Sequence, residues 1–501
     1  MSRKKGIALS YIYTGLNTVI GLFMSAFIIQ SVGQQNYGIY QAVSAFASYL
    51  ILLELGTGTI LNRNISLLKK DGTEQKEIQK SISTIWSITL ILSFAIALVS
   101  AVFYLLLDTI YSNSLTPAQI EFGKPLFIFT IVKLIVSFYT NTLNGALIGF
   151  ERYAIPKAVG IAHLLLRTAL VVGLLSVYGS IYLMVIIDAI LALLVFVFTY
   201  FYCKIKIKIS FNPKYFDLLV FRSAIPLAVA LLFQTIINMA NNSVDKFVIS
   251  VTMPPEHVAV YSVGMFIFMT FSSATTIPIT MYMPQVAQNY RKGLRGLELT
   301  NTMIPACRLV TVIGGLILFG FVTIGRPFVR LLYGTEYIDA WLIAVIVMIP
   351  MFVNMTNGVV VNLLDITNKR LARSIILLGT TALNIGLTVW WVLQWGMIGA
   401  AVATAIATTI GQVIIINTYY QKVLDIKIVH LFFQSYKGIL PSLALSCAIG
   451  FISTLLFSSD ILKFFVGGFV FVLIFALCFL SFGSNAGEKN IIRKFVKRFS
   501  K

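Results

Sequence analysis

The lysines and arginines of this chain lie almost entirely in every second connection between long apolar segments. Of the 38 basic residues, 30 fall in eight such groups, from Arg3 near the start to the tail that begins at Lys489. The intervening connections, such as Ser31–Tyr37 and Tyr178–Ser180, hold no Lys or Arg. Integral membrane proteins keep Lys and Arg on the cytoplasmic side of the bilayer. The alternation therefore predicts a multi-pass membrane protein with both termini in the cytoplasm.

Composition supports the same class. Hydrophobic residues make up 58% of the chain and charged residues 11%, whereas a soluble domain has about 25% charged residues. A net charge of +20 would suggest nucleic acid for a soluble protein. Here the positive-inside bias and the anionic cytoplasmic leaflet account for the charge, so we expect the lipid bilayer as a partner and no nucleic acid.

About 20 apolar residues are needed for a helix to cross the hydrocarbon. On this basis the chain is predicted to be an all-α membrane protein with about fourteen transmembrane helices. The predicted spans are 8–30, 38–60, 81–107, 123–148, 155–177, 180–203, 218–243, 258–284, 298–324, 340–364, 372–394, 396–420, 435–457 and 462–481.

A weak internal repeat divides these spans. Tyr40 and Tyr261 open the second and eighth spans at an offset of 221 residues, and further matches follow in the same order at similar offsets. We therefore predict an N-lobe at 1–210 with spans one to six and a C-lobe at 211–430 with spans seven to twelve, in parallel repeat. Residues 431–501 would form spans thirteen and fourteen and a basic cytoplasmic tail. Parallel repeats of six helices place a substrate path between the lobes near the middle of the membrane.

Five ionisable residues lie inside predicted spans, where each costs about 2.5–3.5 kcal/mol on insertion scales. Lys133, Arg167 and Arg308 lie roughly ten residues from the nearer span end, about 15 Å deep. Glu54 and Asp188 are the acids. Two interpretations stay open: the bases face a cavity with a net positive charge, or the two acids neutralise two of them as buried pairs.

Polar residues at helical spacing accompany these charges. The span 123–148 carries Lys133, Ser137, Thr140, Asn141 and Asn144. The span 218–243 and the residues just after it carry Gln234, Asn238, Asn241, Asn242 and Asp245. Steps of three and four hold such residues on one helical face, which favours the lining of a cavity, although hydrogen bonds between helices are the other explanation.

A positively charged cavity rich in amides suits a pyrophosphate that carries sugars, because charge-assisted hydrogen bonds from Lys and Arg are strong. The candidate substrate-binding residues are Lys133, Arg167, Arg308, Asn141, Asn144, Asn238 and Asn241. The candidates for charge coupling or ion pairing are Glu54, Asp188 and Asp245. We expect no cofactor. The chain has no Walker motif, so ATP is not expected to drive transport directly. No metal is expected, since the histidines and cysteines lack ligand spacing. The outer loops are short, and no enzyme site is expected.

Loose motifs surround the first four spans. Val32-Gly33 and Tyr37-Gly38-Ile39-Tyr40 lie between spans one and two, Leu55-Gly56-Thr57-Gly58 ends span two, and Gly149 and Arg152 follow span four. With fourteen spans, the chain resembles the oligosaccharide flippases (Wzx type) of the multidrug/oligosaccharidyl-lipid/polysaccharide (MOP) exporter superfamily. The resemblance implies a bacterial plasma-membrane protein with two six-helix lobes.

The resemblance also implies a function. Such a flippase moves undecaprenyl-pyrophosphate-linked oligosaccharide repeat units to the outer leaflet by alternating access, for surface polysaccharide biosynthesis. The expected partners are the lipid-linked oligosaccharide and, further, a polysaccharide polymerase and assembly proteins. The related lipid II flippases place arginines deep in spans one, two and eight, which this chain does not, and this argues against lipid II as the substrate. The alternatives are a cation-coupled multidrug exporter of the same superfamily and a polysaccharide polymerase.

Overall fold

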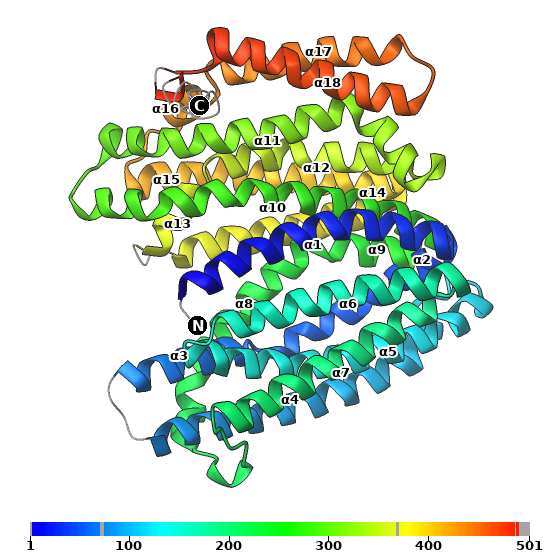
Figure 1. Cartoon of the computed structure of the whole chain (residues 1–501), viewed down its shortest axis with the longest axis vertical. Helices are drawn as coiled ribbons and strands as arrows, with labels where there is room; N and C mark the ends of the chain where they lie inside the picture. The colour runs from blue at the N-terminus through cyan, green and yellow to red at the C-terminus, as the bar shows by residue number, and fades with distance from the viewer. Residues whose placement is uncertain (1–2, 71–74, 367–369, 486, 490–501) are drawn as a thin grey trace, which may run out of the picture. The chain divides into compact units, whose positions relative to one another are not determined.

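The computed structural model describes residues 3–70, 75–366, 370–485 and 487–489, and within these ranges it contains helices and no strand (Figure 1). Contacts between Cα atoms divide the chain into a first unit, Met1–Ala259, and a second unit, Val260–Lys501. The all-α fold predicted from the sequence is confirmed.

The first unit consists of long helices joined by short connections. Its elements are α1 (Arg3–Val32), α2 (Gln34–Ser48), the 3₁₀ helix η1 (Tyr49–Glu54), α3 (Thr57–Lys70), α4 (Gln75–Ile110), α5 (Pro117–Gly149), α6 (Ala154–Tyr178), α7 (Ile181–Lys206), η2 (Pro213–Tyr215), α8 (Leu218–Asn242) and α9 (Val244–Thr252). Local sequence explains where α5 begins. Thr116 and Gln119 form a capping box around Pro117, which occupies the first turn, where a missing N–H costs nothing.

The second unit follows the same plan with more breaks. Its elements are α10 (Pro255–Arg291), which begins just before the unit boundary, α11 (Gly296–Tyr333), η3 (Thr335–Tyr337), α12 (Ile338–Thr356), α13 (Gly358–Ile366), α14 (Arg370–Thr408), the π-helix η4 (Thr409–Ile415), α15 (Ile416–Leu424), α16 (Ile428–Tyr436), α17 (Ile439–Leu455), α18 (Asp460–Cys478) and η5 (Phe479–Gly483).

The described helices provide twelve or thirteen candidate membrane spans, one of which is long enough for two crossings. Twelve are long and apolar enough to span a bilayer, and the pair α16 and α17, bent by 45°, makes a thirteenth. One of the twelve, Arg373–Leu424, has 52 residues and would reach about 78 Å if straight, far more than the hydrocarbon thickness. Gly396 interrupts it with φ 61° and ψ −143°, so this stretch supplies two spans.

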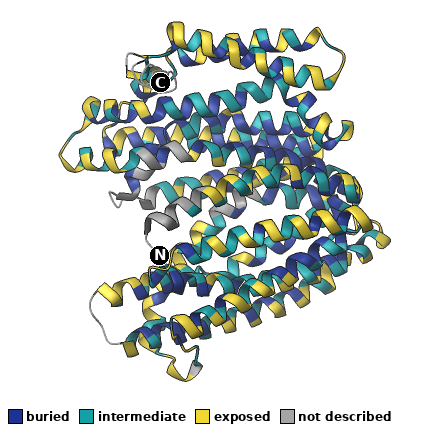
Figure 2. Ribbon diagram, in the orientation of Figure 1, coloured by how far each residue is buried: buried dark blue, intermediate teal, exposed yellow. Residues whose placement is uncertain are grey.

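Many of the long helices expose large apolar side chains. Leu105 and Leu393 are 75% and 72% exposed, and exposed residues recur along the helices of both units (Figure 2). A soluble protein rarely shows contiguous apolar surface of this extent. Together with the spans, this surface identifies the chain as a multi-pass membrane protein.

Glycines let α3 and α5 of the first unit cross at close range. A Cβ added at Gly145 would overlap the carbonyl oxygen of Gly58, and one at Gly58 would overlap the carbonyl oxygen of Asn141. Beside this contact, the hydroxyl of Thr142 lies 2.9 Å from that of Thr57 and 3.1 Å from that of Thr89 on α4. Small residues and interhelical hydroxyl contacts are the usual means of holding helices together in lipid. The crossing sets the rotation of α5, whose polar face is described below.

The lobe boundaries predicted at 210 and 430 stay predictions. The segment after residue 210 includes α8 and α9, which pack within the first unit, α8 against α3 and α4 and α9 against α2. At one such contact, Lys246 of α9 donates a hydrogen bond to the side-chain oxygen of Gln41 at 3.2 Å.

The α3–α5 crossing generates a stability prediction. Gly145→Val should lower the free energy of unfolding by about 1–3 kcal/mol or more, because the added side chain must displace backbone rather than a flexible side-chain end. The midpoint of thermal unfolding in detergent measures this. Gly173→Val on α6 is the control, since nothing lies within 4 Å of a Cβ there. Equal midpoints for the two variants would refute the role of the crossing.

Candidate functional site

Three charged side chains predicted to lie inside spans meet in the first unit. Lys133 of α5 donates to Asp188 of α7 over 2.7 Å, and Arg167 of α6 donates to the same carboxylate through Nε at 2.6 Å and Nη2 at 3.2 Å. Asp188 is 3% exposed, whereas Lys133 is 41% and Arg167 23% exposed. We call these three residues the charge triad. One acid serves two bases, so the triad keeps a net charge of +1.

Lys133, the most exposed base of the triad, lines a polar cavity. This cavity has a volume of about 460 Å³ and lies among α1, α5, α6 and α7. It is lined by Tyr13, Lys133, Ser137, Thr140, Asn141, Asn144, Ile148, Pro156, Lys157, Val159, Gly160, His163, Ala192 and Val195. All five polar residues that the helical spacing placed on one face of 123–148 are among them. The structure thus brings Asn141 and Asn144 together with Lys133.

Glu54 takes a different partner from the one considered in the sequence analysis. It ends η1 and is followed by Leu55 and Gly56, which have φ of 51° and 67°. Its carboxylate accepts a hydrogen bond from the amide of Asn141 at 3.1 Å. Of the two acids, Asp188 therefore pairs with bases, while Glu54 holds an amide of the cavity lining in place.

The mouth of the cavity contains residues that sequence reasoning did not single out. Lys157, near the start of α6, places its Nζ 5.5 Å from the centre of the Tyr13 ring of α1. Gly160 makes this approach possible, because a Cβ there would lie 3.2 Å from the same ring. In the sequence, Lys157 and Arg152 form one of the eight basic groups. Lys157 lies about one helical turn after the start of α6. This position was the sequence signal that its side chain could reach the cavity.

Arg308 lies in the second unit and is engaged by protein groups. Its Nε and Nη2 donate to the carboxylate of Glu488 at 2.7 and 2.9 Å. The remaining donors reach the carbonyl oxygens of Gln434, Lys437 and Gly483 at 2.7–3.1 Å. All five N–H groups of the guanidinium are used in this way. Arg308 joins α11 to the ends of α16 and η5 and to the start of the tail, and we call this set of contacts the Arg308 clasp.

The remaining candidates lie on α8 and α9. Asn238 and Asn241 belong to α8, but their side chains lie outside the described residues. Asp245 lies in the first turn of the following helix, α9, and is 3% exposed. The structure therefore assigns the polar stripe of 218–243 to a helix but gives no contacts for its two asparagines.

The second unit has a polar cluster of its own. Asn354 of α12 donates to Gln412 in the π-helix η4 at 2.8 Å, and Asn357 donates to Asn417 of α15. π-Helical turns often mark functional positions. Asn417 also donates to the carbonyl oxygen of Val413 at 2.7 Å, whereas the buried Oδ1 of Asn357 has no hydrogen-bond partner among the described residues. These contacts connect α12 with η4 and α15.

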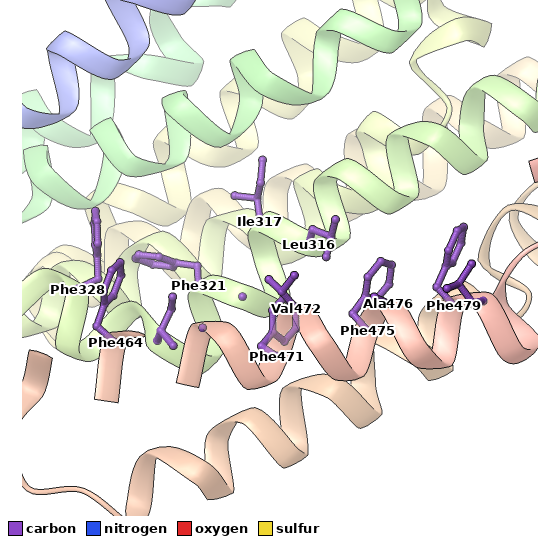
Figure 3. Close-up of a pocket in the computed structure, with 14 residues that line it drawn as sticks. Leu316, Ile317, Phe321, Phe328, Phe464, Phe471, Val472, Phe475, Ala476 and Phe479 are labelled. Carbon is purple, nitrogen blue, oxygen red and sulfur yellow. The ribbon is translucent and has the colours of Figure 1, made fainter. Parts of the chain in front are cut away.

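A larger space in the second unit is apolar. A groove of about 610 Å³ runs between α11 and α18. Figure 3 shows the rings of Phe321 and Phe328 on α11 near those of Phe464 and Phe471 on α18. The groove offers no charged group to a cargo, and its walls suit hydrocarbon.

Comparisons with known proteins agree with this architecture. A sequence family described as "Polysaccharide biosynthesis protein" matches residues 32–342. Among solved structures, the lipid II flippase MurJ in an inward closed conformation is similar with a TM-score of 0.73 at 16% identity, over 94% of this chain and 98% of that one. An inward-facing multidrug resistance MATE family transporter of the MOP superfamily has a TM-score of 0.62 at 14% identity, over 82% and 95%. No curated protein sequence matches the chain significantly. At these identities the structural likeness establishes the fold of the MOP superfamily.

The charge triad generates a prediction. Asp188→Asn removes the only carboxylate that the described contacts give to Lys133 and Arg167. Breaking a buried ion pair lowers the free energy of unfolding by about 3–5 kcal/mol. Because both bases are partly exposed, we expect a decrease near the lower end of this range. Thermal unfolding in detergent measures it. Asp108→Asn is the control and should change little, because Asp108 is 59% exposed and Lys124 keeps Glu121 as a second partner. The same loss in both variants would contradict the shared role of Asp188.

The Arg308 clasp generates a further stability prediction. Arg308→Ala should lower the free energy of unfolding by about 3–5 kcal/mol, because Glu488 and three carbonyl groups lose their donor. Arg330 lies on the same helix, and Arg330→Ala removes a long, partly exposed pair with Asp460 at 3.7 Å. This change should lower the free energy of unfolding by less than about 1 kcal/mol. Matching unfolding midpoints for the two variants would show that the clasp does not stabilise the fold.

Proposed function

The chain belongs to the polysaccharide biosynthesis protein family, and on this premise we propose that it is a flippase for a lipid-linked oligosaccharide. Its substrate would be an undecaprenyl-pyrophosphate-linked repeat unit, moved from the inner to the outer leaflet for surface polysaccharide biosynthesis. The observation that carries the proposal is the charge triad, which presents a net positive charge to an amide-lined cavity.

Electrostatics favour an anion in this cavity. Lys133 and Lys157 line it, and none of the described lining residues is Asp or Glu. The negative charge of Asp188 balances one of the two positive charges in the triad. The site therefore attracts an anion, yet without a bound anion its two bases are not left unpaired. A pyrophosphate would compete with Asp188 for Lys133, the most exposed member, while Arg167 keeps its two bonds to the carboxylate.

Amides in the same cavity suit the sugars. Asn141 and Asn144 line it one helical turn apart on α5, and each amide both donates and accepts hydrogen bonds. Asn238 and Asn241 complete the proposed sugar contacts. Arg308 is not part of the proposed binding site, because the clasp uses all of its donors.

Transport would proceed by alternating access of two lobes in a bacterial plasma membrane, with both termini in the cytoplasm. Lys157 and Tyr13 would then lie toward the cytoplasmic mouth, and Lys133 deeper in the membrane. Glu54 and Asp245 are candidates for coupling transport to an ion. A polysaccharide polymerase and assembly proteins would act on the flipped product.

A cation-coupled multidrug exporter is the second candidate function. The fold similarity to a MATE family transporter favours it. A cationic drug needs acids where it binds, and the polar cavity has lysines instead. The sign of the charge therefore ranks the flippase first. A polysaccharide polymerase ranks last, since connections such as 111–116, on the side opposite the basic loops, leave little room for a catalytic domain.

Cells that lack this protein should accumulate lipid-linked repeat units on the cytoplasmic leaflet and lose surface polysaccharide. Re-expression of the intact chain should reverse both effects, and Lys133→Gln should restore surface polysaccharide to about one tenth or less, because it removes a charge-assisted contact worth about 1.5–3 kcal/mol. Lipid extraction and surface-polysaccharide labelling are the measurements.

Lys124→Gln is the matched control, since Lys124 is a base of the same helix that pairs with Asp108 and Glu121 outside the cavity. Full activity of Lys133→Gln at normal protein levels would refute the proposed binding site. Normal surface polysaccharide in cells without the protein, together with greater drug sensitivity, would favour the exporter.

A further inference from the structure

An apolar slot lies beside the polar cavity of the first unit, between α6 and α7. Its volume is about 220 Å³. Ala162 and Leu166 of α6 form one wall, and Leu191, Leu194 and Phe198 of α7 form the other. Apart from one histidine, all of its lining side chains are apolar.

The slot and the polar cavity share part of their walls. Val159, His163 and Val195 line both spaces. The two therefore meet at these three side chains, with Lys133 and the α5 amides on one side and a hydrocarbon surface on the other. His163 is the polar residue at the junction.

The slot opens on the outer surface of the helix pair. Leu166, Leu194 and Phe198 are 47%, 54% and 53% exposed. Both α6 and α7 are candidate membrane spans, so apolar side chains exposed on them meet lipid. The slot thus forms a lateral path between the lipid and a cavity that has a net positive charge.

Depth in the membrane fits one kind of occupant. His163 lies nine residues after Ala154, where α6 begins, and Phe198 lies eight residues before Lys206, where α7 ends. Both of these helix ends adjoin connections rich in basic residues. Leu166 and Leu191, which also line the slot, lie near the midpoints of α6 and α7. With the predicted orientation, the slot therefore extends from the cytoplasmic half of the bilayer to about its middle.

Building on the proposed function, we propose that this slot holds the apolar tail of the substrate, next to its pyrophosphate. A ligand with an anion at one end and an unbroken hydrocarbon chain at the other matches the two adjoining spaces. A soluble anion would fill the cavity and leave the slot without a role. The part of the isoprenoid chain nearest the pyrophosphate would lie against Ala162 and Leu194, and the rest would extend into the bilayer.

The test uses the purified full chain and two probes, inorganic pyrophosphate and farnesyl pyrophosphate. Ala162→Trp and Leu194→Trp fill the slot from opposite walls without touching the polar cavity. Each should weaken farnesyl pyrophosphate about tenfold, because part of the tail loses its buried surface. Neither should change the affinity for inorganic pyrophosphate.

Ala169→Trp is the matched control, because Ala169 is exposed two turns along the same face of α6, beyond the slot. It should leave the affinity for both probes as in the unaltered chain. Size-exclusion profiles and unfolding midpoints establish that each variant folds. Because the two slot variants lie on opposite walls, the test still stands if one of them fails to fold.

The outcomes separate this inference from the proposed function. Unchanged farnesyl pyrophosphate affinity in both slot variants, or equal losses for the two probes, would overturn the tail site and leave the pyrophosphate site at Lys133 standing. An unaltered chain that binds neither probe, or Lys133→Gln with unchanged affinity for inorganic pyrophosphate, would overturn the pyrophosphate site and the tail site with it.

Discussion

A single carboxylate, that of Asp188, stabilises two positive side chains within the membrane-spanning part of the first unit. An isolated charge at this depth is expensive, whereas a neutral pair has little attraction for an anion. Three charges of unequal sign satisfy both requirements, since every base has a partner and one positive charge is left over. The unequal exposure of the three residues matters as well: the acid is buried, and the surplus charge is presented on Lys133.

That arrangement depends on how closely the helices approach. The glycine contact between α3 and α5 and the threonine hydroxyls beside it set the rotation of α5 about its axis. A rotation of one residue position, about 100°, would carry Lys133 and the α5 amides out of the cavity. Glu54 strengthens this register, because it accepts a hydrogen bond from Asn141 on the same helix. Packing between backbones and polar contacts thus act together to aim one helical face.

The sequence predicts the helices and their polar faces but not which side chains meet in space. Loop charge and apolar length predict the helices and the fold, because both report directly on the bilayer. Spacing along 123–148 predicts a polar face, since the helical period is a local property. Which residues meet in space, by contrast, is not a local property of the sequence. In the sequence, Lys133 and Arg308 each lie about ten residues from the nearer end of a predicted span. In the structure, Lys133 lines a cavity, whereas the donors of Arg308 are taken up by Glu488, 180 residues further along the chain, and by three carbonyl groups. The wall shared by the polar cavity and the slot likewise depends on which helices lie side by side.

The Arg308 clasp has a consequence for biogenesis. Arg308 enters the membrane with α11, whereas Gly483 ends the last candidate span of the described residues and Glu488 follows it, so both leave the ribosome later. During that interval the guanidinium lacks its acid partner, at a cost of about 2.5–3.5 kcal/mol on insertion scales. The second unit therefore reaches its final stability only when synthesis has passed residue 488, so chains truncated before that point would retain an unsatisfied charge that membrane quality control can recognise.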